Sequence, residues 1–231
     1  MQSEITIRGI LQQSWKTYCQ NFQVVVAVVL TVWAPLELLS SYMDVHVFGE
    51  DIQKSWKFAQ FLDNFFGIIA TASVIFIGQE ALIGQRVTFR SALATGFNSW
   101  GKMLWTRIVS RFVLVFAFLL FVLPGIYLSA RLLLVEAVTV QERISGMAAV
   151  KRSYILTEGR FWFMFSIALA VGGLLVVPFV SLAFLSAALD NWFIEAACML
   201  IIDILGAFAS ITLLTVYSHL NNKPPIKPTL E

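Results

Sequence analysis

The sequence predicts an all-α membrane protein with six transmembrane helices and about three interfacial amphipathic helices. Composition is the first reason: 58% of the residues are hydrophobic, 13% are charged, and the mean hydropathy is +0.80. Soluble domains carry about 25% charged residues. The second reason is that the apolar residues gather into six runs, most of them near the roughly 20 residues that cross a bilayer.

We expect one polytopic membrane domain over residues 1–231. The longest polar segments, 44–57 and 223–231, are too short to bury a core of their own. The N-terminal segment lacks the apolar centre and the small-residue cleavage site of a secretory signal, so we expect it to be retained.

Three segments have the spacing of helices that lie in the membrane interface. In residues 4–20, apolar side chains recur at steps of three and four, with polar side chains between them. Residues 88–104 and 144–157 repeat this pattern, with basic side chains off the apolar stripe. We predict an interfacial helix for each segment.

The six apolar runs predict the membrane spans. The third run turns directly into a short fourth one at Pro124-Gly125. The predicted spans are residues 22–43, 59–84, 107–123, 125–140, 161–184 and 192–217.

The distribution of Lys and Arg predicts the orientation of these spans. In a six-span threading, most basic residues fall on the side that holds both termini, whereas the opposite side has Lys54, Lys57 and almost no others. Because cytoplasmic loops carry an excess of basic residues, we expect both termini in the cytoplasm.

A threefold hairpin repeat is one interpretation of the chain. Ser14-Trp15, Ser99-Trp100 and Ser153-Tyr154 each end an amphipathic segment, and an apolar run with a proline follows each. Pro124 follows Ser99 at the same spacing as Pro178 follows Ser153. The repeated unit would be an interfacial helix, a span and a returning span. The alternative is that any multi-span protein with basic inner loops shows similar spacing.

Residues 124–160 carry motifs that resemble a known family. The motifs are PGIYL at 124–128, Arg131, Glu142, Ser145-Gly146, Ala149, Ser153-Tyr154 and Thr157-x-Gly159-Arg160. They resemble a bacterial integral membrane family that includes the membrane domain found beside glycerophosphodiester phosphodiesterases and stand-alone relatives with no assigned activity. The resemblance implies a multi-pass protein of the bacterial cytoplasmic (inner) membrane.

The chain departs from that family in two places. Tyr154 stands where tryptophan is common, and Glu136 lies in a stretch that is usually apolar. No phosphodiesterase domain follows within these residues, so the resemblance implies no enzymatic chemistry for this chain.

Charged residues inside the apolar runs are the first candidate site. Each costs about 2.5 to 3.5 kcal/mol on insertion scales, so such residues usually face a partner or a wet cavity. Counting depth from Pro124 as the outer turn predicts an outer pair of Arg131 with Glu37, and an inner cluster of Arg111, Glu136 and Glu80. The alternative is that these charges only lock the helices together. The candidates are Glu37, Glu80, Arg111, Arg131, Glu136 and Asp203.

Basic residues of the amphipathic segments are the second candidate site. Near an anionic surface each is worth about 1 kcal/mol, so they could bind lipid headgroups. The alternative is simple anchoring, together with the flanking tryptophans. The candidates are Arg90, Lys102, Lys151, Arg152 and Arg160.

Other classes of site find no support in the sequence. The net charge of +2 is too small to indicate a nucleic-acid partner. Cys19 and Cys198 have no pairing or metal-ligand spacing, and His46 and His219 are isolated, so we predict no metal and no cofactor. Nucleophile elbows, HExxH pairs and phosphate-binding loops are absent from the sequence.

These patterns favour a non-enzymatic membrane protein that binds or handles a lipid or amphipathic ligand, or supports a membrane partner. Membrane lipids are the expected partners, with a membrane protein or a second copy of the chain as alternatives. A transporter or channel lined by the buried charges is the second hypothesis, and a continuous polar cavity would favour it. An intramembrane enzyme is the third, and it would need carboxylates that converge with a metal or a nucleophile.

Overall fold

The structure is a computed structural model that describes residues 6–49, 51–189 and 191–221. Within these ranges the regular structure is helical throughout, with no strand, which confirms the all-α prediction. Six segments of the described chain are long and apolar enough to cross a membrane, so the protein is a multi-pass integral membrane protein. They are Phe22–Phe48, Ile52–Leu82, Phe89–Leu120, Val122–Glu142, Phe161–Ser186 and Trp192–Asn221.

The N-terminal part consists of an amphipathic helix and a long apolar one. Helix α1 (Ile7–Gln20) ends at Asn21, and α2 (Phe22–Met43) continues into the π-helical turn η1 (Asp44–Phe48). The side chain of Tyr18 in α1 donates a hydrogen bond of 2.9 Å to the Ile204 carbonyl, which ties α1 to the last helix.

The second span begins earlier than its predicted start at residue 59. Helix α3 (Ile52–Leu62) starts inside the predicted polar loop because Asp51 caps it, accepting a hydrogen bond of 3.1 Å from the Lys54 amide. The π-helical turn η2 (Asp63–Gly67) then joins α3 to α4 (Ile68–Leu82).

Helix α5 (Phe89–Leu120) unites two predicted elements. The predicted interfacial helix 88–104 and the predicted span 107–123 form one continuous helix. No proline or glycine lies between Met103 and Leu120 to end it. Where α5 crosses α4, a Cβ atom at Gly96 would overlap the Ser73 side chain, so the lack of a side chain there permits the close crossing.

The predicted fourth span, 125–140, is divided. Helix α6 (Val122–Arg131) ends in a turn at Leu132–Leu134, and α7 (Val135–Glu142) follows. After α8 (Met147–Leu156), the long helices α9 (Phe161–Leu189) and α10 (Trp192–Asn221) complete the chain.

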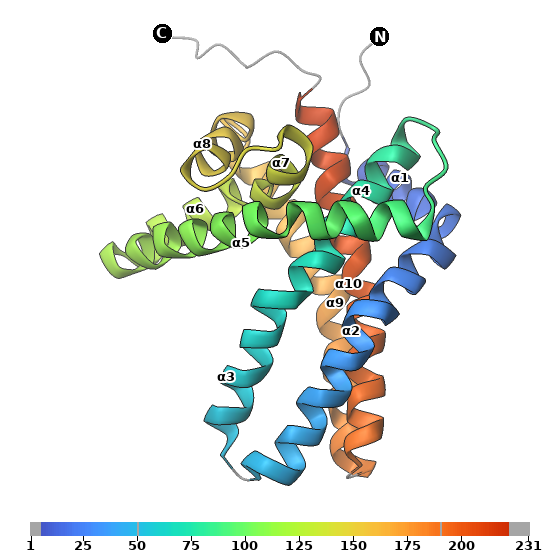
Figure 1. Cartoon of the computed structure of the whole chain (residues 1–231). Coiled ribbons are helices and arrows are strands. Elements are labelled where there is room, and N and C mark those ends of the chain that lie inside the picture. The colour runs from blue at the N-terminus through green and yellow to red at the C-terminus, as the bar shows by residue number, and fades with distance from the viewer. Residues whose placement is uncertain (1–5, 50, 190, 222–231) are drawn as a thin grey trace, which may run out of the picture.

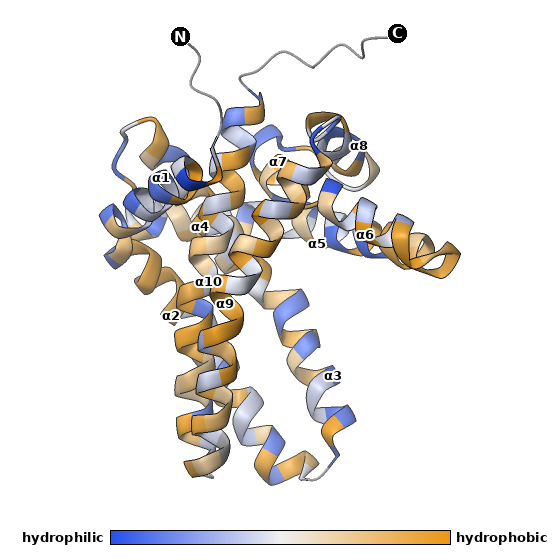
Figure 2. Cartoon of the chain, turned by 180° about the vertical axis from the view of Figure 1, so that it is seen from behind, coloured by the Kyte–Doolittle hydropathy of each residue, from blue (hydrophilic) through white to orange (hydrophobic). Residues whose placement is uncertain are grey.

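The helices point in two main directions (Figure 1). Helices α2, α3, α9 and α10 extend away from the end of the molecule that holds α1, α8 and the last turns of α10. Helices α5 and α6 instead run across the long axes of α9 and α10 and project sideways as a hairpin. Apolar residues cover both the long helices and the outer part of this hairpin (Figure 2).

Helix α4 lies at the centre of the core. Its side chains contribute to two hydrophobic clusters, one with α7, α8 and the end of α10, and one with α2 and the middle of α10. Ile68, Ala72 and Ile75 belong to the first cluster, and Val74 and Ile77 to the second. Because both clusters share α4, this helix positions α2 and α10 around the cavity described next.

Candidate functional site

Four carboxylates line one cavity of about 320 Å³ between α2, α3 and α10. Glu37 comes from α2, Asp63 from the start of η2, and Glu195 and Asp203 from α10. We call this the acidic cavity. The rest of its wall mixes apolar and small polar side chains: Trp33, Leu36, Ser40, Ser41, Ala59, Gln60, Leu62 and Met199.

Helical spacing and one glycine bring these groups together. Trp33 and Glu37 are four residues apart and therefore lie on one face of α2. On α10, Glu195 and Asp203 are about two turns apart and face the same way. A Cβ atom at Gly67 would overlap the Trp33 ring, so the bare backbone of η2 lets the indole pack against it beside Asp63.

A second cavity of about 230 Å³ adjoins the acidic cavity. Trp33 and Asp203 line both, and the second one continues past α4 toward Val29 and Ser210. The Oδ2 atom of Asp203 is buried and makes no hydrogen bond with any described residue. Asp203 therefore places an uncompensated acceptor where the two cavities meet.

Arg107 is the cation nearest to this site in the described chain. Its Nε donates a hydrogen bond of 2.7 Å to Glu136 Oε1, and its Nη1 lies 3.8 Å from Asp63 Oδ1. Its Nη2 donates to Thr71 Oγ1 at 3.3 Å. No basic side chain of the described residues lies within 4.0 Å of the other three carboxylates, so negative charge dominates the cavity.

The predicted charge pairs are wrong. Arg131 does not contact Glu37, Glu136 pairs with Arg107 rather than with Arg111, and Glu80 joins no ion pair among the described residues. The physical reason is the turn at 132–134 and the sideways course of α6. Depth counted along one straight span from Pro124 does not apply to a helix that runs across the others.

Arg131 is satisfied without a carboxylate. It is 3% exposed, its Nε donates a hydrogen bond of 2.9 Å to Thr157 Oγ1, and its Nη2 donates one of 2.5 Å to the Tyr154 carbonyl. The guanidinium also donates to the Tyr127 hydroxyl and lies 3.9 Å from the centre of the Tyr154 ring. Arg131 thus fastens α6 to the end of α8 and lies apart from the acidic cavity.

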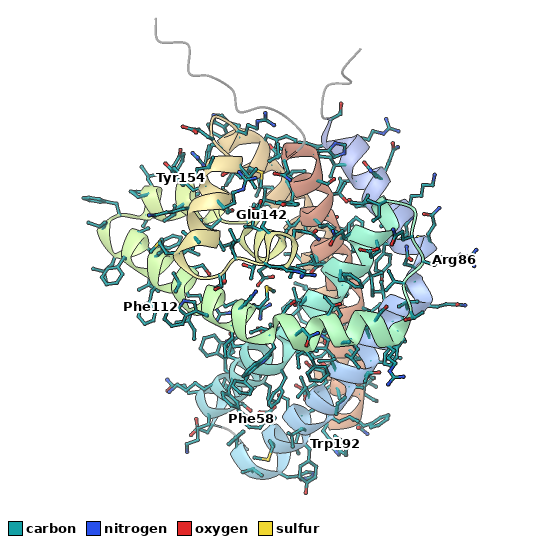
Figure 3. The ribbon with its side chains drawn as sticks, turned by 45° about the horizontal axis from the view of Figure 1, so that its top comes forward. Phe58, Arg86, Phe112, Glu142, Tyr154 and Trp192 are labelled. Atoms are coloured by element: carbon teal, nitrogen blue, oxygen red, sulfur yellow. The ribbon has the colours of Figure 1, made fainter. Side chains whose placement is uncertain are left out.

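The headgroup candidates differ in their surroundings. Arg152 donates two hydrogen bonds, of 2.8 and 3.0 Å, to Glu142, which also accepts one from the Tyr217 hydroxyl at 3.0 Å. Glu142 and Tyr154 both lie in the region of α7 and α8 that Figure 3 shows. Lys102 donates to the Arg143 carbonyl at 3.0 Å, Arg90 and Lys151 are exposed, and Arg160 is half-buried. Headgroup binding by these residues stays a prediction.

Sequence reasoning identified two of the four cavity carboxylates, Glu37 and Asp203, and missed Asp63 and Glu195. It also missed Arg107. Asp63 lies between the apolar runs of α3 and α4, and Glu195 lies in the first turn of α10. In the sequence, both are ordinary charges near the end of a predicted span. Only the folded structure shows that they line the same cavity.

The four carboxylates do not form a metal site. Among the described residues, no group of three or more His, Cys, Asp or Glu side chains could hold a metal ion.

Comparisons of the chain with protein-family models, curated proteins and solved structures found no match. The resemblance of residues 124–160 to a bacterial membrane family therefore stays a prediction.

Proposed function

We propose that this integral membrane protein binds a ligand with a positive charge and an apolar body in the acidic cavity. One observation carries the proposal: Glu37, Glu195 and Asp203 line a cavity inside a membrane-spanning bundle without any ion pair among the described residues. Moving carboxylates out of water costs free energy unless a positive charge or a proton compensates them. A cationic ligand would supply that compensation.

The wall of the cavity suits the apolar part of such a ligand. Trp33 can contact a cation through the face of its indole, and Leu36 and Met199 add aliphatic and thioether surface. A volume of about 320 Å³ lies at the lower end of the range for small-molecule sites. We propose a binding role without chemistry, in a protein that we expect to occupy the bacterial inner membrane with both termini in the cytoplasm.

Binding can be tested with tetraphenylphosphonium, a cation with four apolar rings, and with tetraphenylborate, an anion of nearly the same shape. The protein would be reconstituted into zwitterionic nanodiscs, and binding of each labelled ion measured by equilibrium dialysis. We expect saturable binding of the cation only. Equal binding of both ions would overturn the proposal, because shape rather than charge would then govern recognition.

Matched variants identify the site. Glu37→Gln and Asp203→Asn should each weaken binding of the cation at least tenfold, because each removes one negative charge from the cavity wall. Glu80→Gln makes the same chemical change in a residue that does not line the acidic cavity, and should alter binding less than twofold. Unchanged binding in both cavity variants would also overturn the proposal.

A second candidate function is passage of the cation along α10. The two adjoining cavities together follow α10 from Glu195 to Ser210, a length of about 22 Å at 1.5 Å per residue. Uptake of radiolabelled tetraethylammonium into proteoliposomes, compared between the native chain and Asp203→Asn, tests this candidate. Uptake that Asp203→Asn abolishes would favour transport over binding alone.

A further inference from the structure

The α5–α6 hairpin meets α9 at an unexpected level. The turn between α5 and α6 lies at Phe121 rather than at the predicted Pro124-Gly125, which belongs to α6. Tyr127 follows that turn by six residues, and its ring stacks on Phe161, with 5.1 Å between the ring centroids. Phe161 is the first residue of α9. Had Val122–Glu142 crossed the membrane as one straight helix alongside α9, Tyr127 would lie about 22 Å along that helix from Glu142, and so well away from the start of α9.

Contacts further along α6 agree with this placement. Arg131, the last residue of α6, donates hydrogen bonds to Thr157 and Tyr154, which precede α9 in the chain. The contacts of Tyr127 and those of Arg131 therefore both place α6 beside the start of α9. Figures 1 and 2 show the same relation, because the hairpin runs across α9 and α10 at the end where α1 and α8 lie.

The apolar part of the hairpin is also short. No charged residue lies between Arg111 and Arg131. The turn near Phe121 divides this stretch into two arms of about ten residues, or about 15 Å each. The hydrocarbon core of a bilayer is about 30 Å thick, so neither apolar arm is long enough to cross it.

The large apolar side chains at the tip of the hairpin are exposed, which favours contact with lipid. Leu119 and Leu123 are each 79% exposed, and Phe121 is 74% exposed. The two arms pack on each other at Gly125, where a Cβ atom would overlap the Phe118 ring. Because the tip offers a continuous apolar surface with no charge, acyl chains solvate it favourably and water does not.

We propose that the α5–α6 hairpin inserts into the leaflet next to α1 and α8 and returns, without crossing the membrane. The segments that cross are then α2, α3 with α4, α9 and α10. The arginines Arg107, Arg111 and Arg131 stand at the base of the hairpin, with the apolar tip around Leu123 inside the hydrocarbon of that leaflet.

Cysteine labelling tests the position of the tip. In a Cys19→Ser, Cys198→Ala background, single cysteines would be placed at Leu123, at Gln53 in the first turn of α3, and at Gln85 between α4 and α5. Gln53 and Gln85 are exposed and lie at opposite ends of the candidate span Ile52–Leu82, so they serve as reference positions for the two faces. A membrane-impermeant maleimide is then applied from each face separately.

The proposal predicts that Leu123→Cys does not react from the face that labels Gln53→Cys. A second measurement uses the fluorescence of a bimane attached at position 123. Lipids brominated in the acyl chain should quench this fluorescence more strongly than a water-soluble quencher applied from the Gln53 face. A crossing hairpin would give labelling equal to that of Gln53→Cys and quenching from the water on that face, and this result would overturn the proposal. Labelling of Gln53→Cys and Gln85→Cys, each from one face only and from opposite faces, shows that the background inserts in a single orientation.

Discussion

Arg107 Nε lies 2.7 Å from Glu136 Oε1, which joins α5 to α7 directly beside the acidic cavity. The same guanidinium reaches Asp63 and Thr71, so it connects η2, α4, α5 and α7 in one polar network. Its side chain is only 14% exposed, and it therefore has little access to water. Helices that pack crosswise share few parallel ridges, and a polar network of this kind fixes their register.

Glu136→Gln should destabilise the protein. It leaves the Arg107 guanidinium without its charged partner, and a hydrogen bond to a charged group contributes about 1.5 to 3 kcal/mol. Unfolding followed by tryptophan fluorescence in a mild detergent with added dodecyl sulfate measures the loss. Arg111→Gln is the control one turn further along α5, and it should cost no stability because Arg111 pairs with no carboxylate of the described residues. A larger loss for Arg111→Gln than for Glu136→Gln would contradict the assignment.

Arg131→Lys should be as harmful as a non-conservative change. Lysine can't reproduce the planar fork that reaches Thr157, Tyr127 and the Tyr154 carbonyl together. Each lost hydrogen bond to a charged donor again corresponds to about 1.5 to 3 kcal/mol. We expect a clear fall in melting temperature or in the yield of folded protein, and a yield and melting temperature equal to the native values would show that the fork is dispensable.

The ring of Tyr154 can be tested separately from that fork. Tyr154→Phe keeps the aromatic face 3.9 Å from the Arg131 guanidinium and should leave the stability nearly unchanged. Tyr154→Leu removes the face and should cost about 1 to 2 kcal/mol, the range for a partly desolvated cation–π contact. Thermal unfolding of both variants makes the comparison, and equal losses would assign the effect to the hydroxyl that both variants lack rather than to the aromatic face.

Hydropathy predicted the helices well because the chain satisfies its backbone groups locally in every apolar run. The helix from Phe22 to Met43 has the predicted bounds, and the helices from Phe161 and Trp192 begin where predicted. An aspartate at position 51 is a common helix cap, so the early start of α3 could have been predicted. Lys54 and Lys57 interrupt the apolar residues that follow, and this made the segment resemble a polar loop.

Charge pairing was beyond sequence reasoning because depth counting assumes that every apolar run is parallel to the others. The stacking of Tyr127 on Phe161 shows how that assumption fails, since it places the middle of α6 at the beginning of α9. The acidic cavity depends on which faces of α2 and α10 meet. That choice is made by packing around α4 and by the bare backbone at Gly67, which no periodicity reveals.

Tyr18 should make the stability fall at high pH. Burial raises the pKa of Tyr18 to about 12, with a smaller contribution from the neighbouring Cys19. In the unfolded chain the pKa of tyrosine is about 10. Because the folded state holds its proton more tightly, the contribution of Tyr18 is complete below pH 10 and is lost between pH 10 and about 12.

Tyr18→Phe is the control for the loss of stability between pH 10 and about 12. It removes the hydrogen bond to the Ile204 carbonyl and should cost about 1 kcal/mol at neutral pH. The difference in stability between the native chain and this variant should then shrink as the pH rises from 10 toward 12. A difference that stays constant over this window would show that the Tyr18 hydroxyl is not what loses its stabilising contact.

Neutralising the acidic cavity should stabilise the protein while weakening the proposed binding. Asp203→Asn removes the negative charge of a carboxylate whose buried Oδ2 has no hydrogen-bond partner among the described residues, and Glu37→Gln removes a second negative charge from the same wall. Each should raise the melting temperature by about 2 to 4 °C, which corresponds to roughly 1 kcal/mol at this chain length. Opposed changes in stability and binding are typical of residues kept for function, whereas a loss of both would indicate that these carboxylates serve the fold.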